Sequence, residues 1–178
     1  MGRGKSMNPN ITDKDLTEKG QEPNLKISLL AVPSKLHVTG GREIPFGRAI
    51  LSINNAGNAA VPGFVPHATL AQEGGSVQDI TAALSRTKTA ESIPPGETFK
   101  WDMYDLLLAE HPGVASKVHL WGFKAILNWW FDLTVWVEYQ SSDMATPVRT
   151  ATSRWKFRWN PAKPPSEDVD LSIETVVD

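Results

Sequence analysis

The sequence predicts an all-β fold: an immunoglobulin-like antiparallel β-sandwich with one helical or aromatic insert at about 110–131 and mobile termini. Three observations predict it. Short runs alternate apolar with polar residues, Gly and Pro clusters separate the runs, and each run has only one apolar face. Antiparallel sandwiches produce this pattern because each sheet buries one face and exposes the other to water. A chain of 178 residues is long enough for one domain with a hydrophobic core.

The alternating runs place the individual strands. We expect strands at 25–32, ended by Pro33, and at 48–54, 67–72, 98–104, 132–139 and 154–159. In the run at 132–139, Leu133, Val135, Val137 and Tyr139 should face the core. The last two strands should pair antiparallel. Residues 77–92 fit both helical and extended patterns, so their structure is left undecided.

Three segments follow from the changes in pattern. Residues 1–24 mix charges with Gly, Asn and Pro without periodicity, and we expect a flexible N-terminal arm there. The sandwich should span 25–159. Residues 160–178 begin with a Pro-rich linker and continue as an acidic C-terminal strand or tail.

Composition argues against several classes of function. A formal net charge of −2 gives no long-range field of one sign, so neither nucleic acid nor an anionic membrane is indicated as a partner. With no Cys there is no disulfide, thiolate metal site or cysteine nucleophile. The run WKFRW at 155–159 interleaves aromatic and basic residues, but in a strand these point to opposite faces.

Catalytic signatures are missing from the sequence. The His residues are scattered without the paired spacing of a metal site, at His37, His67, His111 and His119. There is no phosphate-binding loop, nucleophile elbow or dinucleotide fingerprint. We therefore expect a chain that is not an enzyme, with no catalytic residue, no metal and no cofactor.

Three short motifs carry a family resemblance. INNAGNAA at 53–60, IPPGET at 93–98 and LTVWV at 133–137 occur in the order seen in CARDB-type immunoglobulin-like domains of bacterial adhesion-related proteins, which the chain resembles over about 25–159. In that family an Asn-x-Gly turn follows the second strand and a Pro-Pro-Gly-Glu turn precedes a long strand. The resemblance implies a β-sandwich module of surface proteins and assemblies, and it implies no catalysis. The long segment 105–131 departs from the family pattern.

The insert at 110–131 is the first place where function is expected. It is rich in aromatic residues, among them Trp121, Phe123, Trp129 and Trp130. Helical spacing favours a helix that plugs an open end of the core. The alternative is an exposed aromatic patch that binds a membrane, a carbohydrate or a protein partner. Of these partners, the membrane is not favoured.

The C-terminal run at 169–173 is the second place where function is expected. Val169, Leu171 and Ile173 alternate with polar residues, as in a strand. This strand either folds back on its own sheet, stays a loose tail, or is donated to a neighbouring subunit. Strand donation would make Val169, Leu171 and Ile173 part of a partner-binding surface.

Taken together, the sequence favours a non-enzymatic structural or protein–protein interaction module. We expect it to self-associate or to join a larger assembly such as a virion, pilus, sheath or surface layer. The alternative is a peripheral binding domain that presents the aromatic insert. The sequence has no signal-peptide core and no run of about 18 apolar residues. We therefore expect the chain in the cytosol or in an assembly formed there, with a processed secreted form left open.

Overall fold

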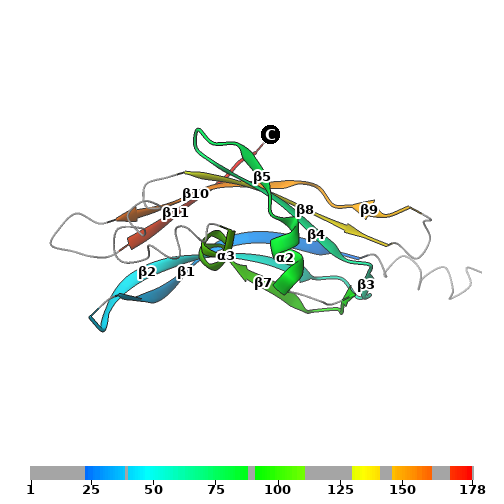
Figure 1. Ribbon diagram of the computed structural model, residues 1–178. Helices are drawn as coiled ribbons and strands as arrows, with labels where there is room; N and C mark the ends of the chain where they lie inside the picture. The colour runs from blue at the N-terminus through cyan, green and yellow to red at the C-terminus, as the bar shows by residue number, and fades with distance from the viewer. Residues whose placement is uncertain are drawn as a thin grey trace, which may run out of the picture.

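The all-β sandwich predicted from the sequence is confirmed by the computed structural model, in which most of the described chain is strand. The structure describes residues 23–38, 40–87, 91–110, 130–140, 146–161 and 169–177. The strands lie in two layers (Figure 1). The expected N-terminal arm, apart from residues 23 and 24, and most of the expected insert lie outside the described residues.

The first layer is built on a long hairpin. Strand β1 (Leu25–Val38) pairs antiparallel with β2 (Arg42–Asn55) along their whole length, and β7 (Thr98–Asp102) pairs with the other side of β2. A small sheet of β3 (Val61–Pro62) and β6 (Ser92–Ile93) lies near one end of this layer (Figure 1).

The second layer has the order β11, β10, β8, β4, β5. Its strands are β4 (Val65–Gln72), β5 (Val77–Asp79), β8 (Phe131–Tyr139), β10 (Ser153–Pro161) and β11 (Val169–Thr175). The short strand β9 (Val148–Arg149) pairs with the end of β8 beyond β10. The antiparallel pairing of β8 with β10, predicted from the sequence, is confirmed.

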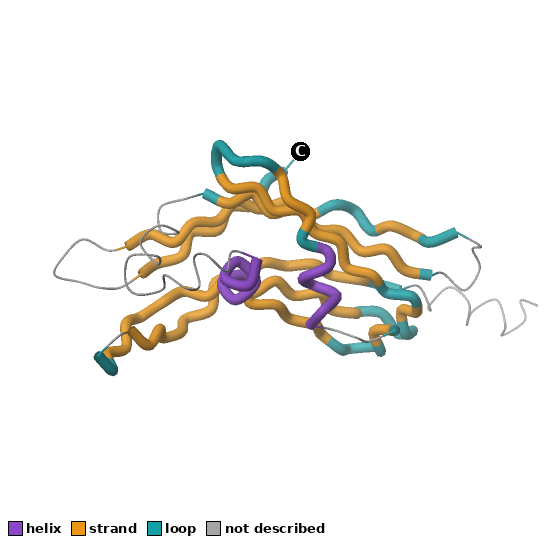
Figure 2. The backbone as a smooth tube through the Cα atoms, in the orientation of Figure 1, coloured by secondary structure: helices purple, strands orange, loops and turns teal. Residues whose placement is uncertain are grey.

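The two layers are joined by strand pairing at one side. Two helices fill the space between them elsewhere. Val169 of β11 pairs in parallel with Phe46 of β2, and this one residue pair joins the hydrogen bonding of both layers. Helices α2 (Thr81–Thr87) and α3 (Met103–Glu110) lie between the layers (Figure 2). The indole Nε1 of Trp101 in the first layer donates to the carbonyl of Leu84 in α2, at 3.1 Å.

The core lies between the layers and is aromatic. In β8, alternate residues are buried and the residues between them are partly exposed. In β10 the side chains of Trp155, Phe157 and Trp159 are buried, while Lys156 points to solvent, as the sequence predicts. Phe157 contacts Phe131 and Trp159 at ring-centroid distances of 5.4 and 5.5 Å. Burial of such large rings is the main source of stability for a sandwich of this size.

The prediction that the first strand ends at Pro33 is wrong, because β1 continues to Val38. Ala56 N–H donates to Asn24 C=O at 2.8 Å, in the register of the β1–β2 hairpin. Hydrogen-bonded and non-bonded pairs alternate in an antiparallel ladder. Even-numbered residues of β1 therefore bond to β2, and odd-numbered residues direct their N–H and C=O groups away from it. Pro33 is odd-numbered, so its missing N–H lies on the outer edge, where it breaks no bond to β2.

The segment 98–104 differs from its sequence prediction, and the structure of 77–92, left undecided from the sequence, is now defined. The strand expected at 98–104 ends at Asp102, and Met103 starts α3. Met103 is buried as expected, but from a helix, and Asp102 Oδ1 accepts the Tyr104 N–H at 2.9 Å at the helix start. The undecided segment 77–92 contains β5, α2 and the start of β6.

Position 47 lets the two layers approach each other. Trp159 Nε1 donates to the carbonyl oxygen of Gly47 at 2.7 Å. A Cβ atom at Gly47 would lie 2.8 Å from Leu171 Cβ and 3.3 Å from Leu171 N, which is closer than side chains pack. The ring of Phe46 stacks on Trp159 with centroids 5.9 Å apart. A glycine is therefore required where β2 and β11 come together.

We expect Gly47→Ala to lower the free energy of unfolding by about 1–3 kcal/mol, the usual cost of overpacking a core. Chemical denaturation measures this loss. A double-mutant cycle with Leu171→Gly, which removes the atom nearest to the added methyl group, should show a favourable coupling between the two changes. Additive effects would mean that the close contact at position 47 does not limit the packing.

Asn55 joins the Asn-x-Gly turn at 55–57 to the Pro-Pro-Gly-Glu turn at 94–97. This buried side chain donates from Nδ2 to the carbonyls of Ala59 and Ile93, at 2.7 and 3.0 Å, and its Oδ1 accepts the Gly57 N–H at 3.0 Å. The Asn55 backbone bonds to the turn at 94–97 as well. The Asn-x-Gly and Pro-Pro-Gly-Glu motifs, far apart in the sequence, therefore meet at this residue.

Replacing Asn55 should destabilise the fold more than replacing its neighbour. Asn55→Ala leaves buried carbonyls and an N–H without partners, which should lower the free energy of unfolding by about 3 kcal/mol. Asn54, whose Nδ2 bonds to Glu97 O and Thr98 Oγ1 near the surface, is the matched control, and Asn54→Ala should lower it by about 1 kcal/mol. Equal losses in urea titrations of both variants would contradict this role for Asn55.

Candidate protein interaction surface

The structure describes only part of the predicted aromatic patch. Trp121, Phe123 and Trp129 lie outside the described residues. Trp130 is half-buried, and the guanidinium of Arg158 lies 4.7 Å from the centre of its ring. This contact covers one face of Trp130 with a residue of the same chain.

The predicted C-terminal strand exists and is used within its own sheet. β11 pairs antiparallel with β10 from Trp155↔Thr175 to Pro161↔Val169. Val169 is buried, and Leu171 and Ile173 pack against the core. Of the fates considered for this strand, the structure shows the fold-back on its own sheet, so the sandwich extends beyond Trp159 to include β11.

The described residues contain no cluster of three or more His, Cys, Asp or Glu side chains that could hold a metal ion. His37 lies near the end of the β1–β2 hairpin and His67 lies on β4, whereas His111 and His119 fall outside the described residues. Asp102 and Asp105 both pair with Arg48, at 2.5 and 3.3 Å, and these contacts raise the pKa of Arg48. Neither described helix is long and apolar enough to cross a membrane.

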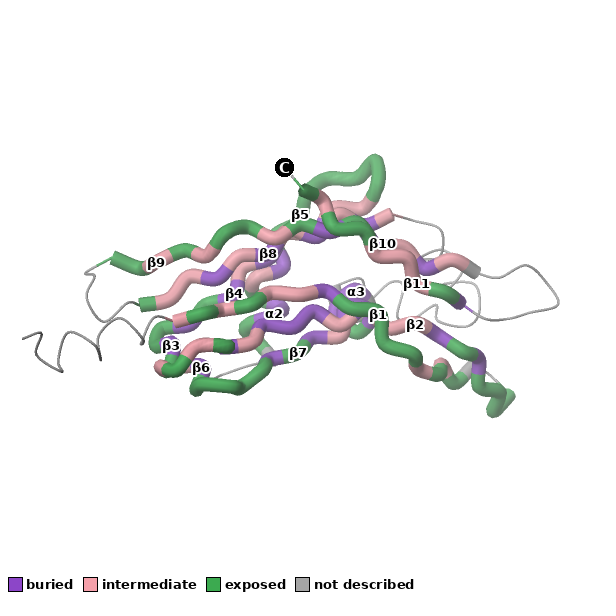
Figure 3. The backbone as a smooth tube through the Cα atoms, turned by 180° about the vertical axis from the view of Figure 1, so that it is seen from behind, coloured by how far each residue is buried: buried purple, intermediate pink, exposed green. Residues whose placement is uncertain are grey.

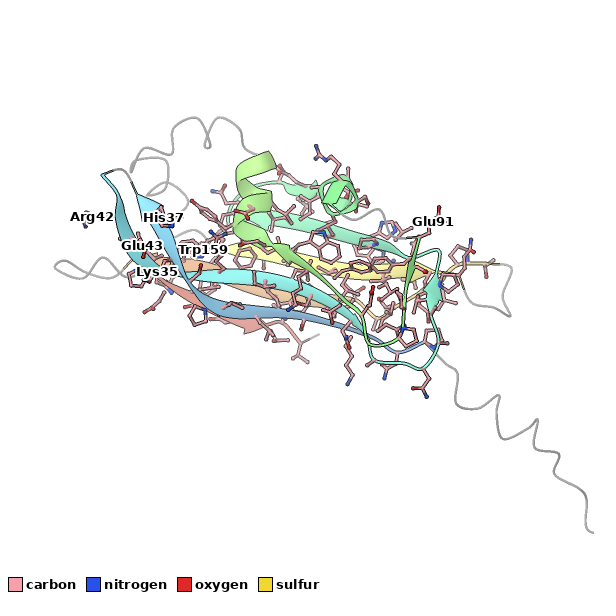
Figure 4. The ribbon with its side chains drawn as sticks, turned by 90° about the horizontal axis from the view of Figure 1, so that it is seen from below. Lys35, His37, Arg42, Glu43, Glu91 and Trp159 are labelled. Carbon is pink, nitrogen blue, oxygen red and sulfur yellow. The ribbon has the colours of Figure 1, made fainter. Side chains whose placement is uncertain are left out.

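The end of the β1–β2 hairpin carries exposed charges. Figure 4 shows Lys35, His37, Arg42 and Glu43 together there. Lys35 Nζ lies 2.9 Å from Glu43 Oε2, and His37 Nδ1 lies 3.5 Å from Glu43 Oε1. The hydrogen bond and charge of Lys35 hold the pKa of Glu43 below its usual range. Such exposed pairs add little stability, so this end is a solvated tip.

The outer face of the second layer carries an aromatic stack. The ring of His67 on β4 lies parallel to Trp136 on β8, with centroids 5.2 Å apart. Arg149 on β9 lies 4.5 Å from the Trp136 ring centre. Because β4 and β9 flank β8, Trp136 is enclosed by side chains from both neighbouring strands.

Polar atoms within this outer face have few partners among the residues that the structure describes. His67 Nε2 lies 3.2 Å from Glu138 Oε2, but without the alignment of a hydrogen bond. Trp136 Nε1 and Arg158 Nε are buried and have no hydrogen-bond partner within the described ranges. Since both faces of the Trp136 ring are occupied, the stack offers no free aromatic platform to a sugar or a base.

The free edge of β1 is the most extensive unpaired feature in the described part of the chain. Among the described strands β1 pairs with β2 alone, so the outward main-chain groups of its odd-numbered residues have no described strand opposite them. Two large apolar side chains in the middle of β1 are exposed, Leu30 at 58% and Val32 at 43%. Figure 3 shows this exposed stretch beside the β1 label. Exposed edges with apolar side chains are templates for pairing with another strand.

Comparisons with protein-family models, with curated proteins and with solved structures each found no match to this chain. The surface must therefore be interpreted from its own geometry. Neither the free edge of β1 nor the Trp136 stack was predicted from the sequence. The sequence does indicate the position of Trp136, because the inward Val135 and Val137 on either side place it on the outer face of the strand.

The Trp136 stack should behave as a stabilising contact within the chain. Arg149→Ala should lower the free energy of unfolding by about 0.5–1 kcal/mol, as for other cation–aromatic pairs at partly exposed sites. In the background Trp136→Leu, which removes the indole, the same Arg149 change should have almost no effect. Thermal or urea unfolding of the four proteins measures the coupling, and a coupling of zero would show that the contact contributes nothing to stability.

Proposed function

We propose that this chain is a non-enzymatic protein–protein interaction module, a subunit or accessory of a larger assembly, that joins its partner through the free edge of β1. One observation supports this above the others. The described chain keeps its C-terminal strand in its own sheet but leaves the long strand β1 unpaired on one side. Main-chain groups at such an edge supply affinity, and the side chains beside them supply specificity.

The side chains of β1 distinguish this edge from the other exposed apolar positions. Val65 on β4, Val77 on β5 and Val177 beyond the end of β11 are exposed singly, whereas Leu30 and Val32 are two residues apart on one face of the same strand. Single exposed apolar residues are common on monomeric proteins. Two adjacent ones beside an unpaired backbone edge form a continuous contact surface.

The association state of the purified chain tests this proposal. We expect the wild type to have a mass above that of the monomer at micromolar concentrations in sedimentation or light scattering. The double variant Leu30→Lys with Val32→Lys should shift the distribution to monomer, because docking would then bury charges. Val77→Lys, at a more exposed apolar residue of the edge strand β5, is the control and should leave the mass unchanged.

Two results would overturn the proposal. One is a wild type that stays monomeric at every accessible concentration. The other is equal loss of association in the β1 double variant and in Val77→Lys, which would place the contact away from β1. Circular dichroism of each variant excludes unfolding as the cause of a lost association.

A further inference from the structure

The backbone of β1 limits how a second strand can dock. Only odd-numbered residues from Leu25 to His37 direct N–H and C=O groups to the free edge. An antiparallel partner must meet these residues with hydrogen-bonding groups of its own. A second copy of β1 has the same set of groups at the same spacing, so odd-numbered residues of one copy would face odd-numbered residues of the other.

One register uses this edge completely. Ala31 is the midpoint of the stretch from Leu25 to His37. If Ala31 faces Ala31 of a second copy, then Leu25 faces His37 of that copy, and every outward residue is opposite another. A shift by two residues in either direction leaves one end unpaired.

The same register matches the exposed apolar side chains. With Ala31 at the centre, Leu30 of each copy faces Val32 of the other. These are non-hydrogen-bonded positions, where cross-strand side chains come closest. A register centred on Leu30 places Val32 opposite Ser28, and one centred on Val32 places Leu30 opposite Ser34. Only the Ala31 register pairs both apolar residues with apolar residues.

The geometry points to a second copy of this chain as the partner, docked edge to edge through antiparallel β1 strands with a two-fold axis at Ala31. This inference rests on the proposed function and names the partner of the same surface. The interface is isologous, so each copy contributes the same residues. Both sheets of β1–β2 hairpins then form one continuous sheet across the dimer.

Charge fits this arrangement, whereas Pro33 opposes it at one position on each side of the axis. Lys26 faces Leu36 of the second copy and Lys35 faces its Ile27, so no two lysines stand opposite each other. Like charges directly opposite would destabilise the pair. Pro33 faces Leu29, and the Pro33 carbonyl accepts the Leu29 N–H, although the Leu29 carbonyl receives no donor in return. The proline therefore removes one hydrogen bond on each side of the axis, and its Cδ points at the Leu29 carbonyl in place of the amide hydrogen.

Disulfide cross-linking between single introduced cysteines reports the register of the two β1 strands. The sequence contains no Cys, so each single variant carries one thiol per chain. Full-length single variants Leu30→Cys, Ala31→Cys and Val32→Cys are oxidised mildly and analysed on non-reducing gels. Residues facing themselves across a two-fold axis fall within the Cα spacing that a disulfide needs. Ser76→Cys, exposed in the turn before β5, reports random collision. Wild-type mass is measured in parallel.

We expect Ala31→Cys to cross-link at least about tenfold faster than Ser76→Cys, since pairing raises the effective thiol concentration. Leu30→Cys and Val32→Cys alone should cross-link no faster than the control, whereas the double variant carrying both should cross-link rapidly through residue 30 of one copy and residue 32 of the other. Fast cross-linking of Leu30→Cys or of Val32→Cys alone would establish a shifted register and overturn the inference.

The remaining outcomes separate this inference from the proposed function. If the wild type associates and the β1 lysine variant does not, yet none of the cysteine variants cross-links, then β1 docks on something other than a symmetric second β1. The inference then fails and the proposed function stands. If the wild type is monomeric and Ala31→Cys does not cross-link above the control, both fail.

Discussion

The register of β8 is the constraint on which the second layer depends. This strand pairs with β4 on one side and with β9 and β10 on the other, and every second side chain from Phe131 to Val137 is buried. A slip of one residue would move Trp136 and Glu138 into the core and expose Val135 and Val137. The aromatic residues of β10 and the stack on the outer face both follow from this alternation. The inner and outer surfaces of the layer are therefore fixed together.

Local alternation explains which parts of the fold could be predicted. β8 and β10 were predicted with nearly correct bounds because inward and outward side chains differ in each. The continuation of β1 through Pro33 could not be predicted, since it depends on which edge faces β2. Met103 is buried in either a strand or a helix, so burial alone did not reveal the start of α3. The contacts of Trp136 with His67 and Arg149 come from the pairing of separate strands, which the sequence pattern does not encode.

The pairing of β11 and of β1 determines which strand edge is free to bind a partner. β11 completes the second layer from within the chain, so Val169 and its neighbours serve the core. β1 has no such strand beyond it among the described residues. A dimer formed by two identical edges is a closed assembly, because each copy pairs with the free edge of the other and no free β1 edge is left for a third copy. Growth beyond a pair would then require a separate contact, such as the outer face of the second layer.

The meeting of Gly47 with Trp159 has a consequence for tracing the ancestry of this fold. The two residues are 112 positions apart; their hydrogen bond requires a long donor on β10, and the bare α-carbon of Gly47 leaves room for Leu171 on β11. Strand lengths and surface residues can change without disturbing that requirement. A divergent descendant would thus be recognised by this matched pair at corresponding strand positions even after overall resemblance had faded.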